Sequence, residues 1–273
     1  MLQMNVADGV HRIEDAHTNW YLVEDDRRLT VVDTGVPRSW ESLQAALAEL
    51  GRKPADIAAV VLTHAHFDHL GFAERARVEL NVPVYVHEND VPLTRHPHQY
   101  AHERARTAYL ATQPRALPYV LGFARTRAWF PTPVGAVTRY AGGSLPVPGS
   151  PRVVLTPGHT LGHCALHLPD RDVVIAGDAV VTLDPYTGRT GPRIIARAAT
   201  ADSERNLATL HDLAETNAGT VLVGHGEPWT GGARDRRSGP CRRHRIIGAP
   251  DHTTSDATGQ PGHRAWTLIF GKA

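Results

Sequence analysis

Cysteine is scarce in this chain: only Cys164 and Cys241 occur among its 273 residues. Two cysteines are too few for a disulfide framework, and they lack the CxxC spacing of a sulfur-ligated zinc site. Any metal that the chain binds must therefore sit on nitrogen and oxygen ligands.

Long apolar runs are also missing. The longest stretches are the size of a strand and far shorter than the roughly 20 residues that a membrane helix requires. The first 15 residues have neither the basic start nor the apolar centre of an export signal. We therefore expect a cytoplasmic protein without a membrane partner.

A large excess of either charge is absent as well, because the formal net charge is +1. This balance gives no general attraction to nucleic acid. It averages two unlike regions: residues 233–273 contain eight Lys and Arg against three Asp, a net charge of +5, which leaves −4 for residues 1–232. The basic tail has no sustained hydrophobic period and is rich in Gly, Pro and Arg, so we expect it to be disordered or an aberrant terminus.

The remaining residues have the pattern of an α/β protein. With 41% hydrophobic residues, the chain can bury a full core. Short apolar runs alternate with helical patterns, and helices are expected over residues 39–51 and 202–217. The expected strands cover residues 29–35, 58–64, 82–87, 152–158, 164–168, 172–178 and 220–226.

One predicted strand leads directly into four potential metal ligands. In "VVLTHAHFDHLGF" (residues 60–72), the apolar run is followed by His64, His66, Asp68 and His69. Histidines at i and i+2 leave a strand on the same side, and the turn that follows can direct Asp68 and His69 toward a second point nearby. The spacing therefore predicts a scaffold for two metal ions.

Three more candidate ligands follow later apolar runs. His159 in "TPGHT", Asp178 in "IAGDAV" and His225 in "VGHGE" each lie beside a glycine that allows a tight turn. Taken singly, each residue is equally well explained as part of an ordinary turn. Their common context, downstream of the HxHxDH motif, favours a role as ligands.

This order of residues resembles the pattern of the metallo-β-lactamase superfamily, in which a strand-end HxHxDH precedes a later His, an Asp and a final His. The resemblance covers about residues 10–232 and fills all seven positions. It implies a four-layer αββα sandwich with the metals at one edge of the paired sheets. By this resemblance the ligands are His64, His66 and His159 for the first metal, Asp68, His69 and His225 for the second, and Asp178 as a bridge.

The ligand set indicates hydrolysis. Imidazoles combined with carboxylates suit two Zn²⁺ ions, although iron and manganese also fit this ligand type. Two such ions can share a hydroxide and polarise a carbonyl oxygen, with Asp68 orienting the water or moving a proton. We expect a hydrolase of a small carboxylic ester, lactone or thioester; the sequence leaves its oligomeric state open.

Differences between this chain and individual branches of the superfamily narrow the range of expected substrates. Asp178 fills a position that lacks an acidic ligand in most true metallo-β-lactamases, which disfavours antibiotic hydrolysis. The 48 residues after His225 are too few for the glutathione-binding domain of glyoxalase II. Acyl-homoserine lactonases commonly have a Tyr where this chain has Val181, and Tyr186 can substitute from the same loop. A phosphodiesterase and a mononuclear-iron sulfur dioxygenase remain alternatives, whereas the complete ligand set disfavours a non-enzymatic metal-binding scaffold.

Other residues are expected to support the ligands or to contact substrate. Asp33, in "VVDTG", matches a supporting position of the superfamily and is also explained as a turn residue. Thr160 and His163 are expected beside the ligands. One catalytic domain is predicted over residues 1–232, in which an aromatic segment from about 92 to 150 forms a wall or lid of the substrate pocket. The predicted pocket residues are Tyr100, Tyr109, Phe123, Trp129 and Tyr186.

Overall fold

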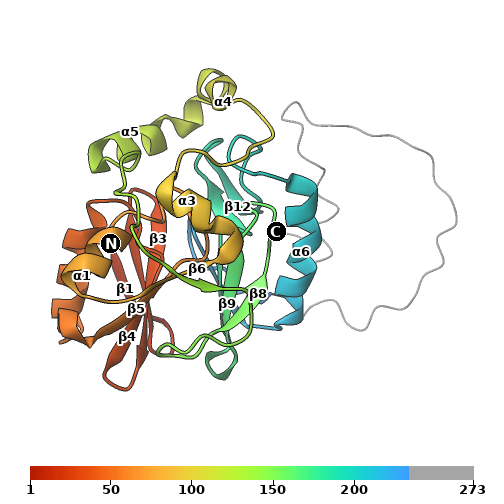
Figure 1. The fold of residues 1–273 in the computed structure, drawn as a ribbon. Coiled ribbons are helices and arrows are strands. Elements are labelled where there is room, and N and C mark those ends of the chain that lie inside the picture. Colours follow the sequence, from red (N-terminus) through yellow and green to blue (C-terminus); the bar gives the residue numbers. More distant parts are fainter. Residues whose placement is uncertain (234–273) are drawn as a thin grey trace, which may run out of the picture.

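The computed structural model describes residues 1–233, apart from the side chains at positions 108, 110 and 111. Two β-sheets lie face to face and carry helices on their outer faces (Figure 1). The predicted four-layer αββα sandwich is confirmed. The tail expected over residues 233–273 lies outside the described residues, except for Ala233, which is buried and donates its N–H to the carbonyl of Ala218.

The larger sheet has seven strands that follow one another in chain order. Its first four strands are antiparallel, and its last four run parallel to one another, with β4 shared between the two sets. The strands are β1 (Leu2–Ala7), β2 (Val10–Asp15), β3 (Thr18–Asp25), β4 (Arg28–Val32), β5 (Ile57–Val61), β6 (Val84–His87) and β7 (Thr138–Tyr140).

The smaller sheet has four strands in the order β13-β10-β9-β8. Strands β10 and β13 are parallel, whereas the other neighbours are antiparallel. The strands are β8 (Arg152–Leu155), β9 (Cys164–Leu168), β10 (Val173–Gly177) and β13 (Thr220–Val223). A separate two-stranded ribbon consists of β11 (Val181–Asp184) and β12 (Arg189–Arg193).

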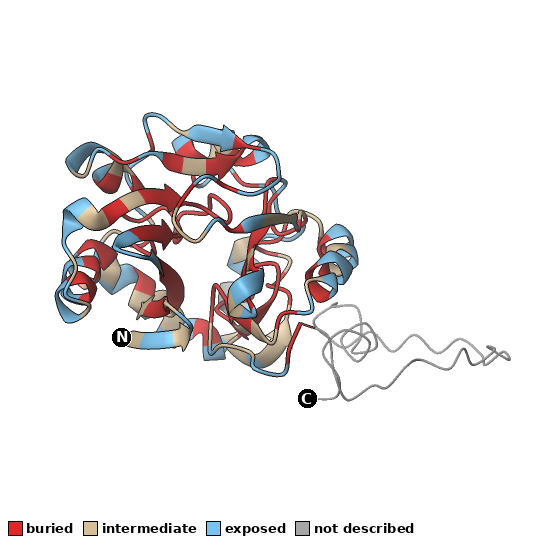
Figure 2. Ribbon diagram, turned by 90° about the horizontal axis from the view of Figure 1, so that it is seen from below, coloured by how far each residue is buried: buried red, intermediate tan, exposed pale blue. Residues whose placement is uncertain are grey.

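Alternate side chains of strand β3 pack into two different hydrophobic layers. Because successive side chains of a strand point to opposite faces, Trp20 and Leu22 pack under the helices, whereas Tyr21 and Val23 pack between the sheets. All four side chains are at most 2% exposed. Strand β10 divides in the same way between the inter-sheet core and the helix behind the smaller sheet. Buried residues accordingly follow the strands and the inner sides of the helices (Figure 2).

Two helices cover the outer faces of the sandwich. Helix α1 (Ser39–Glu49) packs on the larger sheet and α6 (Ser203–Glu215) on the smaller one. The helices predicted over 39–51 and 202–217 are thus confirmed, with ends shifted by at most two residues. The other helical elements are α2 (Ala73–Glu79), α3 (Val91–Arg95), α4 (Arg106–Thr112) and α5 (Leu117–Thr126), and the 3-10 turns η1 (Pro54–Asp56), η2 (Glu88–Asp90), η3 (Pro114–Ala116) and η4 (Pro169–Arg171).

The N-terminal strands and β7 were not identified from the sequence. Residues 2–25 form β1 to β3, and β7 lies inside the segment from about 92 to 150, where it pairs with β6. Tyr140 of β7 donates its hydroxyl to the carbonyl of Leu62 at 2.8 Å. Only the part of this segment with α4 and α5 stands apart from the sandwich (Figure 1). Across residues 1–233, no helix is long and apolar enough to span a membrane.

The candidate ligands lie at the ends of strands. His64 and His69 belong to the turn after β5, Asp178 directly follows β10, and His225 follows β13. His159 lies in the connection from β8 to β9. Because parallel neighbours deliver their carboxyl ends to the same edge of a sheet, the fold brings these positions to one side of the sandwich.

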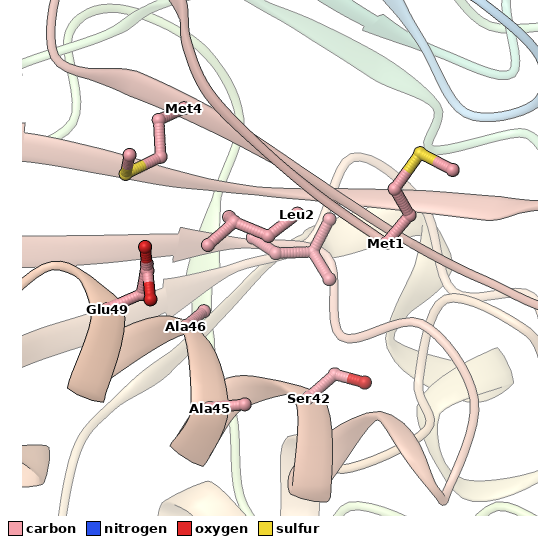
Figure 3. Close-up of a pocket in the computed structure, with 8 residues that line it drawn as sticks. Met1, Leu2, Met4, Ser42, Ala45, Ala46 and Glu49 are labelled. Atoms are coloured by element: carbon pink, nitrogen blue, oxygen red, sulfur yellow. The ribbon is translucent and has the colours of Figure 1, made fainter.

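A groove of about 490 Å³ lies elsewhere, between the N-terminal strand and α1 (Figure 3). It contains none of the candidate ligands. Its lining residues are Met1, Leu2, Met4, Ile13, Ser42, Ala45, Ala46 and Glu49.

Leu166 tests the inter-sheet core, because this residue of β9 is fully buried between the two sheets. Leu166→Ala should lower the free energy of unfolding by about 2–5 kcal/mol, since the removed atoms leave a cavity. The matched control is Leu155→Ala in the neighbouring strand β8, where the side chain is 47% exposed and the change should stay within about 0.5 kcal/mol. Urea unfolding followed by circular dichroism measures both values, and equal effects would contradict this packing.

Candidate metal centre

The loop after β5 is held in place by Asp33. Its Oδ1 accepts the N–H of Thr63 and its Oδ2 accepts the hydroxyl of Thr63, both at 2.8 Å. Oδ2 also lies 3.1 Å from Nδ1 of His69. The Asp33 carboxylate therefore ties both ends of the HxHxDH loop to the end of β4.

All seven candidate ligands come together in one buried cluster with Asp178 at its centre. None of them is more than 6% exposed. From the loop after β5, Nε2 of His64 and Nε2 of His69 lie 3.7 and 3.6 Å from Oδ2 of Asp178. From the smaller sheet, Nε2 of His159 and Nε2 of His225 lie 3.4 and 3.3 Å from the same oxygen. One carboxylate oxygen is thus surrounded by four imidazole nitrogens.

Two sets of side chains around Asp178 have the geometry of a metal site, each with three ligand atoms within 4.8 Å of one another. The first set is His64, His66 and His159, and the second is Asp68, His69 and His225. A third set of comparable size includes Asp33, whose oxygens already accept hydrogen bonds from the loop that it holds. The cluster therefore offers two adjacent positions for a cation.

Several buried polar atoms of this cluster have no hydrogen-bond partner among the described residues. They are Nε2 of His64, His66 and His69, both ring nitrogens of His159, and Oδ1 of Asp178. Burying so many polar atoms without partners is costly, because each loses its contact with water and gains nothing in return. Each neutral imidazole has one lone pair, and a divalent cation that accepted these lone pairs and that of the carboxylate would remove most of this cost, so the donor set fits metal ions that prefer nitrogen and oxygen ligands.

The pKa values divide the cluster into neutral and charged groups. Burial lowers the pKa of His66 to about 3 and lowers those of His64 and His159 well below the ordinary value, so these rings keep their lone pairs free. Burial also acts to lower the pKa of His225, but the neighbouring carboxylates, chiefly Asp178, outweigh it and raise the pKa to about 10. The carboxylates beside His225 thus favour a positive charge at this position.

Two further histidines are oriented through Nδ1, as His69 is. Nδ1 of His64 lies 3.0 Å from the hydroxyl oxygen of Thr63, and Nδ1 of His225 donates to the backbone carbonyl of His17 at 2.7 Å. These contacts fix the rings so that Nε2 faces the cluster. The contribution of His17 was missed from the sequence, because a backbone carbonyl can come from any residue type.

His163 lies directly behind Asp178. Its Nε2 accepts the backbone N–H of Asp178 at 3.0 Å, and its Nδ1 lies 2.8 Å from the hydroxyl oxygen of Thr156. Burial lowers the pKa of His163 to about 3, so the ring is neutral and able to accept this hydrogen bond. His163 therefore joins the end of β10 to the end of β8.

Asp90 connects the two loops that carry candidate ligands. Its Oδ2 accepts the hydroxyl of Thr160 at 2.7 Å and the N–H of Ala65 at 3.0 Å. Its Oδ1 accepts the N–H of Gly162 at 2.8 Å. Thr160 thus acts through Asp90. Asp90 was not identified from the sequence, although it follows β6 by three residues, as the other polar site residues follow their strands.

Glycine is required where the backbone passes the cluster. A Cβ atom at Gly224 would lie 1.9 Å from Oδ1 of Asp178, which is far inside van der Waals contact. Gly177 has a φ of 50°, and a Cβ atom there would lie 2.6 Å from Oγ1 of Thr63. Only hydrogen atoms fit at these two positions beside the carboxylate.

The five residues predicted for the substrate pocket all line one of two neighbouring cavities. Tyr100, Phe123 and Tyr186 share a small cavity with five candidate ligands: His66, Asp68, His159, Asp178 and His225. Tyr109, Phe123, Trp129 and Tyr186 line an adjoining cavity of about 110 Å³.

Tyr100 brings the segment before β7 into contact with the cluster. The centroid of its ring lies 4.1 Å from that of His66, and its hydroxyl lies 3.2 Å from the hydroxyl of Tyr186. Phe130, another aromatic residue of the segment, is 75% exposed and faces solvent instead. The small cavity therefore has one wall of candidate ligands and another of aromatic side chains, and the adjoining cavity extends the aromatic wall.

The family model of the metallo-beta-lactamase superfamily matches residues 13–225, a span that contains the whole cluster. The chain belongs to this superfamily. It is a metal-dependent hydrolase by family, in agreement with its buried His and Asp groups.

Relatives within the superfamily match most of the chain. The probable metallo-hydrolase YflN of Bacillus subtilis (strain 168) is 27% identical over 238 residues, which cover 82% of this chain and 86% of YflN. The metallo-beta-lactamase family protein TTHA1429 of Thermus thermophilus has a TM-score of 0.59 at 26% identity, over 82% of this chain and 75% of that one. TTHA1623 in a di-iron-bound form has a TM-score of 0.56 at 29% identity, over 80% of this chain and 92% of that one.

Gly224→Ala tests the close approach of β13 to Asp178. The added methyl group should displace the carboxylate and lower the metal content of the purified protein, while circular dichroism shows an intact fold. The matched control is Gly142→Ala, because a Cβ atom at Gly142 meets no heavy atom within 4 Å. Metal analysis by plasma mass spectrometry checks both variants; a full metal content in Gly224→Ala would show that the position of this carboxylate is unimportant.

Proposed function

We propose that this protein is a dinuclear metal hydrolase that cleaves a small carboxylic ester, lactone or thioester. The observation that carries the proposal is the set of unpartnered imidazole nitrogens around the buried carboxylate of Asp178. In this proposal His64, His66 and His159 would hold the first metal, Asp68, His69 and His225 would hold the second, and Asp178 would contact both.

The two cations would supply a water molecule acidic enough to act as a nucleophile near neutral pH and would polarise the carbonyl oxygen of the substrate. Asp178, between the two sets of ligands, would offset the repulsion between the cations. Asp68 lines the small cavity beside Tyr100, where it can orient water or carry a proton to the leaving group. The aromatic wall excludes bulk water from the acyl group and strengthens these electrostatic interactions.

Zinc is the metal that we propose for both positions, because imidazole and carboxylate ligands suit Zn²⁺. Iron is the main alternative, since the related TTHA1623 is described in a di-iron-bound form. Metal analysis of protein purified without added metal tests this choice. About two zinc ions per chain would support the proposal, about one iron would favour the sulfur dioxygenase alternative, and no metal would favour a scaffold.

The adjoining cavity supports an acyl substrate over a phosphodiester. Its lining is aromatic and aliphatic except for one arginine, and its volume of about 110 Å³ suits a short chain or a ring. A panel of lactones, thioesters and phosphodiesters, assayed with the metal-loaded protein, tests the reaction class. Hydrolysis of the phosphodiesters alone would overturn the proposal.

Asp178→Asn tests the bridging role. The amide keeps the shape but removes the negative charge between the two cations, so the metal content should fall from about two to about one per chain and turnover should fall at least about 100-fold. The control Asp170→Asn changes an exposed carboxylate in η4 and should leave both values unchanged. Plasma mass spectrometry, turnover and circular dichroism are measured together. Two metals retained with near-normal activity in Asp178→Asn would refute the dinuclear mechanism.

A further inference from the structure

The cavity beside the metal centre contains one charged residue, Arg106, at the start of α4. Four of its lining residues also line the small cavity that exposes the candidate ligands, so the two spaces adjoin. The lining consists of Phe67, Arg106, Tyr109, Ala116, Tyr119, Val120, Phe123, Trp129, Pro185 and Tyr186.

The guanidinium of Arg106 has unused hydrogen-bond donors. Its Nε is buried without a partner, and its one hydrogen bond within residues 1–233 is a long contact of 3.4 Å from Nη2 to the carbonyl of His98. No carboxylate of the described residues forms an ion pair with Arg106. Its Cζ lies 4.1 Å from the centroid of the Tyr100 ring, so a cation–π contact holds the group at the wall of the cavity.

The Arg106 side chain is half-buried, and its Nε lies out of reach of water without a partner, so an anion in the cavity would satisfy a donor that the protein leaves unpaired. The planar guanidinium presents its N–H groups as a fork that matches the two oxygens of a carboxylate. We propose that Arg106 binds a carboxylate carried by the substrate. On the basis of the function proposed above, the substrate is then an ester, lactone or thioester with an anionic group apart from the bond that is cleaved.

The position of Arg106 fits a substrate whose anionic group lies apart from the bond that is cleaved. Tyr100 contacts His66 with its ring, at 4.1 Å between centroids, and contacts Arg106 at the same distance. Arg106 is therefore one aromatic ring removed from the metal centre. A substrate carbonyl at the metals and a carboxylate at Arg106 would be separated by a short acyl chain along the wall formed by Tyr100, Phe123 and Tyr186.

A binding measurement tests this site without turnover. Isothermal titration calorimetry of the metal-loaded protein uses 3-phenylpropionate as the probe and its uncharged amide as the reference. Arg106→Gln should raise the Kd of the acid roughly 10-fold and leave that of the amide unchanged, since only the acid forms the charged pair. Arg106→Lys should lie between the two, because it keeps the charge but not the fork. The control is Arg125→Gln, an exposed arginine of the adjacent helix α5, which should bind the acid like the unaltered protein.

Unchanged binding of the acid by Arg106→Gln, with normal metal content and circular dichroism, would overturn the proposal, since the acid would then bind the metals or another part of the protein. The proposal also fails if Arg125→Gln weakens binding as much as Arg106→Gln does, because the loss would then reflect the general charge of the surface.

Kinetics separates this proposal from the proposed hydrolase activity. The substrates are the p-nitrophenyl monoester of adipate, whose acyl chain ends in a carboxylate too distant to attack its own ester readily, and the p-nitrophenyl ester of hexanoate, whose chain ends in a methyl group. Arg106→Gln should lower kcat/KM for the charged ester, relative to kcat/KM for the uncharged ester, about 10-fold or more. If both esters are hydrolysed and the ratio does not change, the carboxylate site is wrong and the hydrolase stands. If neither ester is hydrolysed but binding of the acid depends on Arg106, the carboxylate site stands and the hydrolase proposal is wrong.

Discussion

The burial of one carboxylate among four imidazoles is the constraint on which the rest of this structure depends. Asp178 is 1% exposed, and its Oδ1 has no partner within the described residues. Such a group is tolerated in a protein interior only if a positive charge stands beside it. The strands that end at the cluster, the glycines that let the backbone pass and the carboxylates behind the imidazoles all serve this one arrangement.

The residues that could be predicted from the sequence are those whose own side chain forms part of a recognisable pattern. The HxHxDH motif, Asp178 and the two isolated histidines each combine a polar side chain with the end of an apolar run, and the structure brings them together. Strands and helices with a clear hydrophobic period were found for the same reason. Their ends were misplaced by a few residues, because the polar residues that follow each strand lie in the turn and not in the ladder.

The residues that escaped prediction act through the backbone or across long sequence distances. The carbonyl of His17 orients His225, and no side-chain pattern reports such a contact. Arg12 was missed because it is buried, against the usual preference of arginine for the surface. Its guanidinium donates to Asn19, which in turn donates to the carbonyl of Gly226, so the N-terminal hairpin holds the turn that carries His225. More than 200 residues separate these partners along the chain, and only the fold brings them together.

The candidate ligands come from both sheets and meet at one edge of the sandwich, so this edge connects its two halves. His64 and His69 belong to the larger sheet, whereas Asp178 and His225 belong to the smaller one. A cation held between them would act as a cross-link that closes a loop of more than 100 residues, and it would bind the native state in preference to the unfolded chain. The free energy of unfolding would then rise with the concentration of free metal, so that removing the metal would promote unfolding as well as inactivity.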